Sequence, residues 1–194
     1  MIAGHFGFAA GVKSREPATP LWALMLATVW LDVVFAPLLA NGIEYIEKVP
    51  GAAPYGGLVI HADYTHSLVG AALLSVILGI PIALWWGARS GIVVGLVSFS
   101  HWLLDLVVHR GDLPLLPGNI GHLPKLGFGL WRFPMAAATI ELILVLAGAY
   151  LYWRAADKVA VAAGRGRRLA AANGVMVLAF GVLVLCLDVS GVAG

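Results

Sequence analysis

Charged side chains are scarce in this chain of 194 residues. Asp, Glu, Lys and Arg together make up 11% of it, whereas hydrophobic residues make up 61%. A soluble globular domain carries roughly 25% charged residues, and a disordered chain is poorer in apolar residues than this one. The composition therefore excludes an ordinary soluble domain and intrinsic disorder, and it predicts a protein that lives in a lipid bilayer.

Cysteine is almost absent too. The single Cys186 lies in an apolar run and has no second cysteine to pair with, which excludes a disulfide framework and a cysteine-based zinc finger. The net charge is only +2 and the basic residues fall in short connections, so nucleic acid is not expected as a partner. Phosphate loops and dinucleotide fingerprints are also missing. Any metal ion must therefore be held by histidine, aspartate or glutamate.

Apolar runs of membrane-spanning length are what the chain has in abundance. A spanning helix needs about 20 mostly apolar residues, and five segments qualify: residues 20–40, 67–87, 91–108, 134–153 and 169–187. Residues 1–12 are apolar as well, but a helix of that length is only about 18 Å long, so we predict a half-helix or re-entrant piece. We expect an all-α polytopic membrane helix bundle that forms a single membrane-embedded domain over residues 1–194.

The basic residues of the connections are divided unequally between the two sides of the membrane. Four fall on one side, namely Lys48, Arg110, Lys125 and Arg132; the other side receives eight, namely Lys13, Arg15, Arg89, Arg154, Lys158, Arg165, Arg167 and Arg168. By the positive-inside rule the richer side faces the cytoplasm. We therefore expect a multi-pass protein of the cell membrane with its Lys13 and Arg15 side in the cytoplasm and its C-terminus outside.

Ionisable residues occur inside the predicted spans, where each costs at least ~2.5–3.5 kcal/mol to insert. Residues that persist at this cost normally face a cavity or one another. With a rise of about 1.5 Å per residue, the outer half of the bilayer receives ionisable residues from four different spans, namely Asp32, His66, His101, Asp105 and Glu141. His5 joins them if the N-terminal piece dips to mid-depth. This convergence is the strongest functional signal in the pattern.

His101 and Asp105 are four residues apart and therefore share one helix face. An imidazole and a carboxylate side by side can bind one cation, and this donor pair suits Zn, Mn or Fe(II). A buried hydrogen bond that serves only packing would show the same spacing. The further His and Asp residues at the same depth favour a metal site or a proton-handling site. At the water interface, by contrast, we expect His109 and Asp188 to be hydrated.

The order of these residues resembles that of a known family. The chain reads Gly4-His5, then Asp32, then Thr65-His66-Ser67, then Ser100-His101-x-x-x-Asp105. This order resembles the YdjM family, whose members are inner-membrane proteins described as metal-dependent hydrolases. The similarity continues through Gly-Asp-Leu-Pro-Leu-Leu-Pro at residues 111–117 and ends near Trp-Arg-Phe at residues 131–133.

The resemblance implies that a divalent metal is bound or served by five residues, namely His5, Asp32, His66, His101 and Asp105. The chain departs from the family pattern in two places. Residues 31–35 read Leu-Asp-Val-Val-Phe in place of Pro-Asp-x-Asp-His, and residues 61–63 read His-Ala-Asp in place of His-Arg-Gly. A carboxylate, an imidazole and an arginine suited to phosphate are thereby lost. Asp63 is a candidate replacement for the lost carboxylate.

The leading hypothesis is a membrane-embedded metal-dependent hydrolase that acts on a lipid or phosphoester. Zn, Mn or Fe would lower the pKa of a water molecule, and Asp63 or Glu141 would accept its proton. Glu141 fits a positioning role or a protonated helix contact equally well. The alternative is a non-enzymatic subunit of a larger membrane complex. Such a subunit would be an accessory chain, a haem carrier with His66 and His101 as axial ligands, or a proton or cation pathway.

Overall fold

The structure, a computed structural model, describes residues 1–191 and is almost entirely helical. Four helices are long and apolar enough to cross a membrane: α4 (Leu68–Trp86), α5 (Ala88–Val108), α6 (Pro134–Ala162) and α7 (Arg167–Ser190). The pair α2 (Leu21–Ala27) and α3 (Trp30–Ala40), bent by 48° where they meet, is apolar enough to count as a fifth span or a re-entrant segment. The prediction of an all-α polytopic bundle with about five spans is confirmed.

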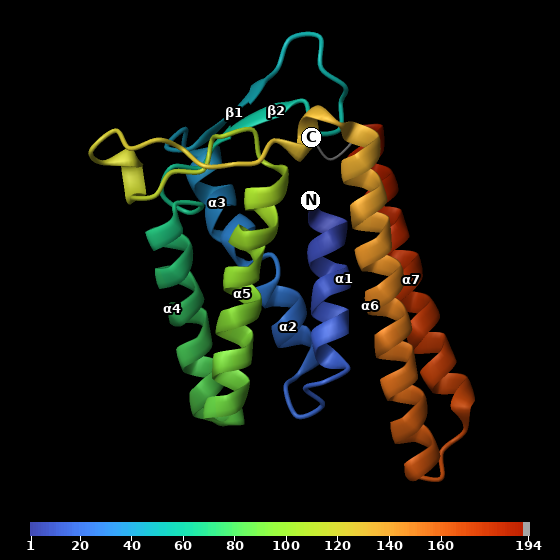
Figure 1. The fold of residues 1–194 in the computed structure, drawn as a ribbon. Coiled ribbons are helices and arrows are strands. Elements are labelled where there is room, and N and C mark those ends of the chain that lie inside the picture. The colour runs from blue at the N-terminus through green and yellow to red at the C-terminus, as the bar shows by residue number, and fades with distance from the viewer. Residues whose placement is uncertain (192–194) are drawn as a thin grey trace.

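The helices are arranged around a short central segment, α1 (Ile2–Lys13). Figure 1 shows the α4–α5 pair on one side and the α6–α7 pair on the other, with α1 and α2 between them. The loops that follow α3 and α5 gather at one end of the bundle together with a small antiparallel sheet of β1 (Tyr45–Lys48) and β2 (Leu58–His61). As predicted, α1 is too short to span the membrane, and neighbouring helices surround it.

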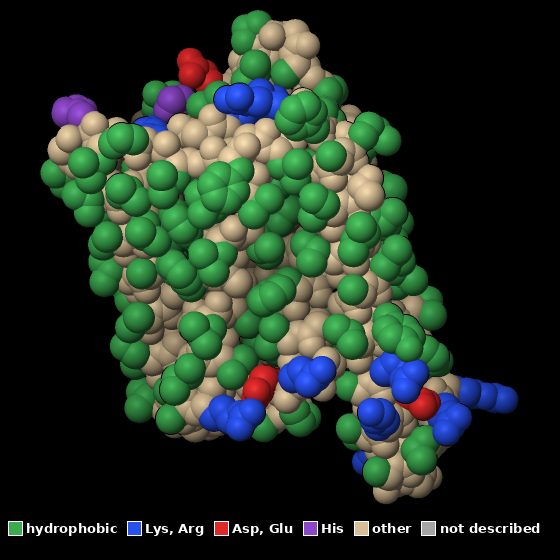
Figure 2. All heavy atoms as spheres, in the orientation of Figure 1, with side chains coloured by type: hydrophobic (Ala, Val, Ile, Leu, Met, Phe, Trp, Pro, Cys, Tyr) green, Lys and Arg blue, Asp and Glu red, His purple; other side chains and the backbone are tan. Residues whose placement is uncertain are grey.

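The sides of the bundle are apolar. Figure 2 shows hydrophobic side chains over most of the flank, whereas Lys and Arg gather mainly at the end opposite the sheet. Exposed apolar residues occur on every long helix and include Leu84, Ile92, Met135 and Val175. Such a surface is stable only in contact with lipid, because water would not cover an apolar area of this size without a large cost. The protein is therefore a multi-pass membrane protein.

The break between α2 and α3 interrupts a segment that the sequence predicts as one span. Two contacts hold the broken turn at Thr28: its hydroxyl donates to the carbonyl oxygen of His5 (2.8 Å), and its carbonyl oxygen lies 2.8 Å from Nδ1 of His101. Irregular backbone is tolerated at membrane depth where protein groups satisfy its polar atoms. Hydropathy did not predict the break, because the residues that stabilise it come from other helices.

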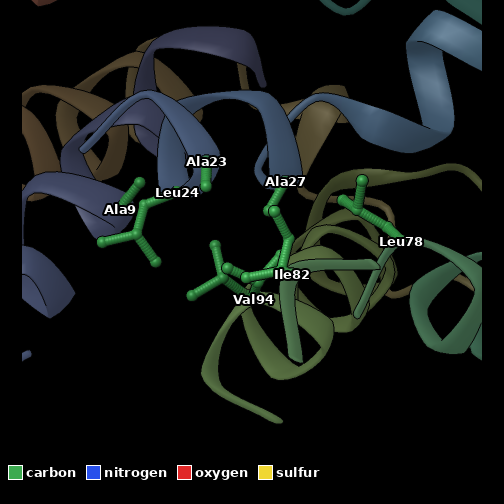
Figure 3. Packing of buried hydrophobic residues seen from close by; sticks show 8 residues of the cluster. Ala9, Ala23, Leu24, Ala27, Leu78, Ile82 and Val94 are labelled. Carbon is green, nitrogen blue, oxygen red and sulfur yellow. The ribbon is translucent and has the colours of Figure 1, made fainter. Parts of the chain in front are cut away.

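Small residues allow the central helices to pack closely. The largest cluster of buried apolar residues joins α1 and α2 to α4 and α5 (Figure 3), and it consists of Ala9, Ala23, Leu24, Ala27, Leu78, Ile82, Val94 and Val97. On its other side α1 meets α6 through glycines. A Cβ atom on Gly148 would lie 1.9 Å from the carbonyl oxygen of Gly7, so neither position has room for a side chain. This contact fixes α1 in depth, and with it His5, two residues from Gly7.

Candidate metal centre

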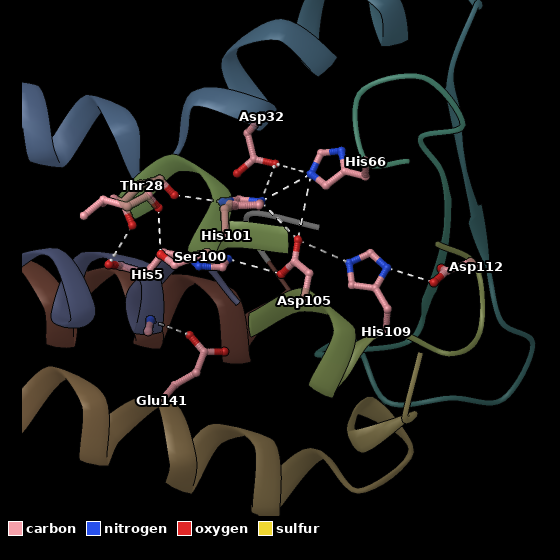
Figure 4. Close-up of polar contacts among 12 residues, drawn as sticks. His5, Thr28, Asp32, His66, Ser100, His101, Asp105, His109, Asp112 and Glu141 are labelled. Atoms are coloured by element: carbon pink, nitrogen blue, oxygen red, sulfur yellow. Dashed lines mark hydrogen bonds and ion pairs between the residues drawn. The ribbon is translucent and has the colours of Figure 1, made fainter. Parts of the chain in front are cut away.

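The fold brings together all five residues for which the sequence predicts a metal role. His5 comes from α1, Asp32 from α3, His66 from the turn before α4, and His101 and Asp105 from α5 (Figure 4). Two groups among them have potential ligand atoms within 4.8 Å of one another: His5 with His101 and Asp105, and Asp32 with His66 and His101. Only the Asp32 side chain is appreciably exposed, at 39%, so the cluster opens beside α3.

His66 and His101 present their Nε2 atoms to each other, to Asp105 and to Asp32 at distances close to those around a tetrahedral metal ion. Nε2 of His66 lies 3.2 Å from Nε2 of His101 and 3.8 Å from Oδ2 of Asp105, and the His101 to Asp105 distance is 3.0 Å. Oδ1 of Asp32 lies 3.5 Å and 3.6 Å from the same two histidine nitrogens. Zinc bonds of ~2.0–2.1 Å in tetrahedral geometry place ligand atoms about 3.3 Å apart. The observed distances bracket this value.

The hydrogen bonds of the two histidines fix which ring nitrogen carries the proton. Nδ1 of His101 faces the carbonyl oxygen of Thr28, which can only accept, so Nδ1 must donate. In the neutral ring, Nε2 of His101 therefore presents a lone pair. The same holds for His66, whose Nδ1 lies 2.9 Å from Oγ1 of Thr65 while that hydroxyl donates to a carboxylate. Two lone pairs 3.2 Å apart repel, so either a metal ion or a proton on one of the two rings must lie between them.

The carboxylate behind His66 belongs to Glu44, a residue that the sequence analysis did not single out. It is fully buried, and its oxygens accept from the Thr65 hydroxyl (2.9 Å) and from the backbone N–H groups of Tyr64 (2.7 Å) and Thr65 (3.0 Å). The series His66, Thr65, Glu44 is thus a directed chain of hydrogen bonds that orients the imidazole. Glu44 gave no signal because it lies outside the apolar spans.

His5 contacts the other oxygen of the central carboxylate. Its Nε2 lies 3.2 Å from Oδ1 of Asp105, and its ring stacks on that of His101 with centroids 3.9 Å apart. Nδ1 of His5 is buried without a hydrogen-bond partner. Asp105 therefore presents one oxygen to His5 and the other to His66 and His101, which makes it the central residue of the cluster.

His109 is buried beside the cluster, so the expectation that it would be hydrated is wrong. Its Nε2 lies 3.7 Å from Oδ2 of Asp105, and its Nδ1 donates to Oδ1 of Asp112 (2.8 Å). Burial alone would raise the pKa of the Asp112 carboxyl, but the hydrogen bonds from His109 and from the backbone N–H of Ile60 hold that pKa below its usual value. The loop after α5 folds back over His109, which the apolar pattern does not reveal.

The remaining candidates lie around this centre. Asp63 pairs with Nζ of Lys125 at 2.6 Å and does not line the cavity described below. Glu141 is fully buried, where it accepts a hydrogen bond from the backbone N–H of Gly4 (3.0 Å) and a very short one from the hydroxyl of Tyr55. Asp188 is half-buried and lines the same cavity, and one of its carboxylate oxygens is buried without a hydrogen-bond partner.

A cavity of about 190 Å³ adjoins the cluster. Its polar wall includes all five predicted ligands together with His109, Trp131 and Asp188. The apolar wall comes from α3 and the small sheet and includes Phe35, Ile46, Leu58 and Ile60. Among the described residues, no Lys or Arg side chain lines the cavity. The site is thus a carboxylate- and imidazole-rich chamber beneath the sheet.

Comparisons with known proteins identify one related family. The family described as YdjM inner membrane protein matches residues 1–191 of the chain. The match therefore extends beyond the quoted motifs to include α6 and α7. Searches among curated proteins and among solved structures find no similar chain.

Proposed function

This chain belongs to the YdjM inner membrane protein family, and we propose that it is a membrane-embedded metal-dependent hydrolase. The observation that carries the proposal is the pair of imidazoles whose Nε2 atoms lie 3.2 Å apart, with a carboxylate oxygen of Asp32 and one of Asp105 beside them. Two imidazole nitrogens with carboxylate oxygens beside them are donors that suit zinc, and the same donors suit manganese or iron(II). The spacing does not favour a haem, because no macrocycle fits between two nitrogens at this distance.

A divalent ion held by Asp32, His66, His101 and Asp105 would polarise the bond to be cleaved and acidify a water molecule. His109 is placed to take the proton at Nε2, because its Nδ1–H is committed to Asp112. We assign this role to His109 and not to Asp63 or Glu141, since His109 lines the cavity and contacts Asp105.

The position of the cavity favours a substrate with an apolar part. The cluster opens beside Asp32, and the adjoining wall carries Phe35, Ile46 and Leu58. A lipid could place its chains along this wall with its head at the cluster, so we propose a lipid or phosphoester substrate. Because most Lys and Arg lie at the opposite end (Figure 2), the positive-inside rule supports a cytoplasmic position for that end and an outer position for the site.

The test is the metal content of the detergent-purified protein. We expect about one equivalent of zinc, manganese or iron in the wild type, its loss in the His101→Ala/Asp105→Ala double variant, and no change in His122→Ala, which removes an exposed histidine outside the cluster. Visible spectra of the same samples should lack a haem band. A wild type that binds no metal after purification without chelator, even when metal is added back, would overturn the proposal.

Activity is the second measurement. The metal-loaded wild type should hydrolyse at least one lipid ester or phosphoester, and the double variant should not. Retained hydrolysis in the double variant would show that the cluster is not the catalytic site.

A further inference from the structure

A second hollow lies on the lipid-facing flank of the bundle, further from the sheet than the cavity. It is a groove of about 380 Å³ over α1, bounded by α2 on one side and by α7 on the other, and we call it the α2–α7 groove. None of its lining residues is polar or charged; they are Phe6, Gly7, Leu21, Met25, Val145, Met176, Val177, Phe180 and Gly181. Such a groove can hold hydrocarbon but offers nothing to a polar ligand.

Close helix packing accounts for the hollow. A Cβ atom on Gly7 of α1 would lie 2.5 Å from the carbonyl oxygen of Leu144 in α6. One on Gly181 of α7 would lie 2.7 Å from Cγ1 of Val145, also in α6. Both positions therefore require glycine, and the backbone that lines the groove there carries no side chain to fill it.

The groove continues the cavity along the same helix faces. Ile2 lines the cavity and Phe6 lines the groove, and these residues are four apart in α1, so they share one face. Asp188 of the cavity and Gly181 of the groove are two turns apart in α7 and share a face in the same way. Because α1 runs away from the sheet and α7 runs towards it (Figure 1), both helices place the groove on the side of the cavity that faces the membrane centre.

A second groove over α1 lacks this relation to the cavity. It lies between α5 and α6, where its lining includes Val93 and Ala147. Among the residues that the structure describes, α6 contributes none to the cavity wall, whereas α7 contributes Asp188 and α3 contributes Asp32. The path from the metal cluster into the hydrocarbon therefore runs between α3 and α7.

The length of the α2–α7 groove suits one lipid chain. From Asp188 in the cavity to Met176 in the groove, α7 covers roughly 18 Å. The hydrocarbon of one leaflet is about half of a core that is ~30 Å thick. A lipid with its head at the cluster could therefore lay a whole acyl chain along the groove. Met25 and Met176 line it, and their flexible, unbranched side chains can adapt to such a chain.

The groove would position a lipid and contribute little to its affinity. A hydrocarbon chain gains almost nothing by moving from the bilayer into an apolar groove, because both environments exclude water. A chain that lies in the groove does determine where the attached ester group lies. Since misplacement of a reacting group by ~1 Å can cost about 100-fold in rate, the effect of the groove should be seen in the hydrolysis of long-chain lipids.

We propose that the α2–α7 groove binds one acyl chain of the lipid whose head group lies at the metal cluster, and that this lipid enters from the bilayer between α3 and α7. The inference rests on the proposed function and narrows its substrate class to lipids with at least one long acyl chain. The cavity wall at Phe35 and Ile46 contacts the same lipid nearer to its head.

The first test compares two variants of α7 in mixed detergent micelles. Val177→Phe places a ring in the groove, whereas Val175→Phe makes the same change at an exposed position outside it. We expect Val177→Phe to lower kcat/KM for a long-chain lipid substrate by about tenfold or more with metal content unchanged, and Val175→Phe to match the wild type. The dihexanoyl form of the same lipid should be hydrolysed equally by both variants, because Val177 lies roughly 16 Å from Asp188 along α7 and short chains do not reach it.

Photolabelling tests the same site without any reaction. Phosphatidylglycerol with a diazirine at the middle of one acyl chain should label groove residues such as Met25 and Phe180, and excess unlabelled phosphatidylglycerol should suppress this labelling. Lipid that only surrounds the protein would label the whole flank without preference. The suppressible labelling should be lost in Val177→Phe and kept in Val175→Phe.

Equal hydrolysis of the long-chain lipid by the two variants, or no suppressible labelling of the groove, would overturn the inference. A change of oligomeric state in Val177→Phe would also overturn it, since the groove would then hold a second protein chain, and so would labelling confined to the α5–α6 groove. Suppressible labelling without hydrolysis of any lipid would uphold the groove and refute the hydrolase. The two proposals therefore fail in distinguishable ways.

Discussion

Replacement of Thr65 by valine tests whether the hydrogen bonds behind the metal cluster matter. The hydroxyl of Thr65 accepts from Nδ1 of His66 and donates to Glu44, and the residue is 2% exposed. Valine has almost the same shape but no hydroxyl, so Thr65→Val leaves Nδ1–H of His66 buried and unpaired whenever Nε2 binds a metal. In the metal-free protein the proton can move to Nε2, and the penalty is smaller.

The expected effect on metal affinity follows from that difference. An unsatisfied buried donor costs about 1–3 kcal/mol, which corresponds to a factor of roughly 5–150 in a binding constant. Loss of a group that orients a metal-binding histidine typically costs 10–100-fold in metal affinity. This factor agrees with the one estimated from the cost of an unsatisfied donor. We expect Thr65→Val to weaken zinc binding by about tenfold or more.

The assay is a competition titration of zinc between the purified protein and a chelator of known affinity. Thr65→Ser keeps the hydroxyl and should bind zinc almost as tightly as the wild type, whereas Thr139→Val removes a hydroxyl that bonds only to its own helix, at the carbonyl oxygen of Met135, and should have no effect. Zinc affinity of Thr65→Val within twofold of the wild type would refute the argument that this hydrogen-bond chain supports the site.

Three further predictions concern stability and topology. Removal of the metal by chelator should lower the melting temperature in detergent, and its return at about 100 times Kd should restore about 2.7 kcal/mol; an unchanged melting temperature would contradict a metal bound to the folded state. Gly148→Ala should cost about 1–3 kcal/mol or more, because its Cβ would lie 1.9 Å from the carbonyl oxygen of Gly7. Gly166→Ala, where the new methyl group meets open space, should lose far less stability in the same thermal unfolding experiment. Equal stability of the two variants would contradict the close packing of α1 on α6. A reporter inserted at Gly51, between the two strands, should appear outside the cell and one inserted at Gly87, between α4 and α5, in the cytoplasm; the reverse result would invert the proposed orientation.

The sequence predicted those site residues whose positions follow from helical spacing and from depth in the membrane. His101 and Asp105 lie on one helix face, and charged residues at a common depth in an apolar bundle have few partners except one another, so Asp32 and His66 could be expected beside them. The bundle itself was predicted from composition, because apolar runs of this length have no other stable environment, and the structure confirms it.

What the sequence did not predict depends on contacts between distant segments. Nothing in an apolar run marks Thr28 as the point where the helix breaks, since the break is stabilised by His5 and His101. Residues in loops, such as Glu44 and Asp112, acquired their burial only from the way in which the loops fold over the helix ends. The pairing of Asp63 with Lys125 likewise joins two loop segments.

The short length of α1 has a consequence for how the protein is made. This helix of 12 residues cannot hold a position across the membrane alone, and its glycine contact is with α6, which is synthesised more than 100 residues later. The contact that fixes the depth of His5 can therefore form only after α6 has been synthesised, whereas α1 can pack on α2, α4 and α5 before then. Because His5 lies 3.2 Å from Asp105, the final geometry of the cluster depends on the packing of α6 against α1. Full metal occupancy would then mark molecules in which this late contact has formed.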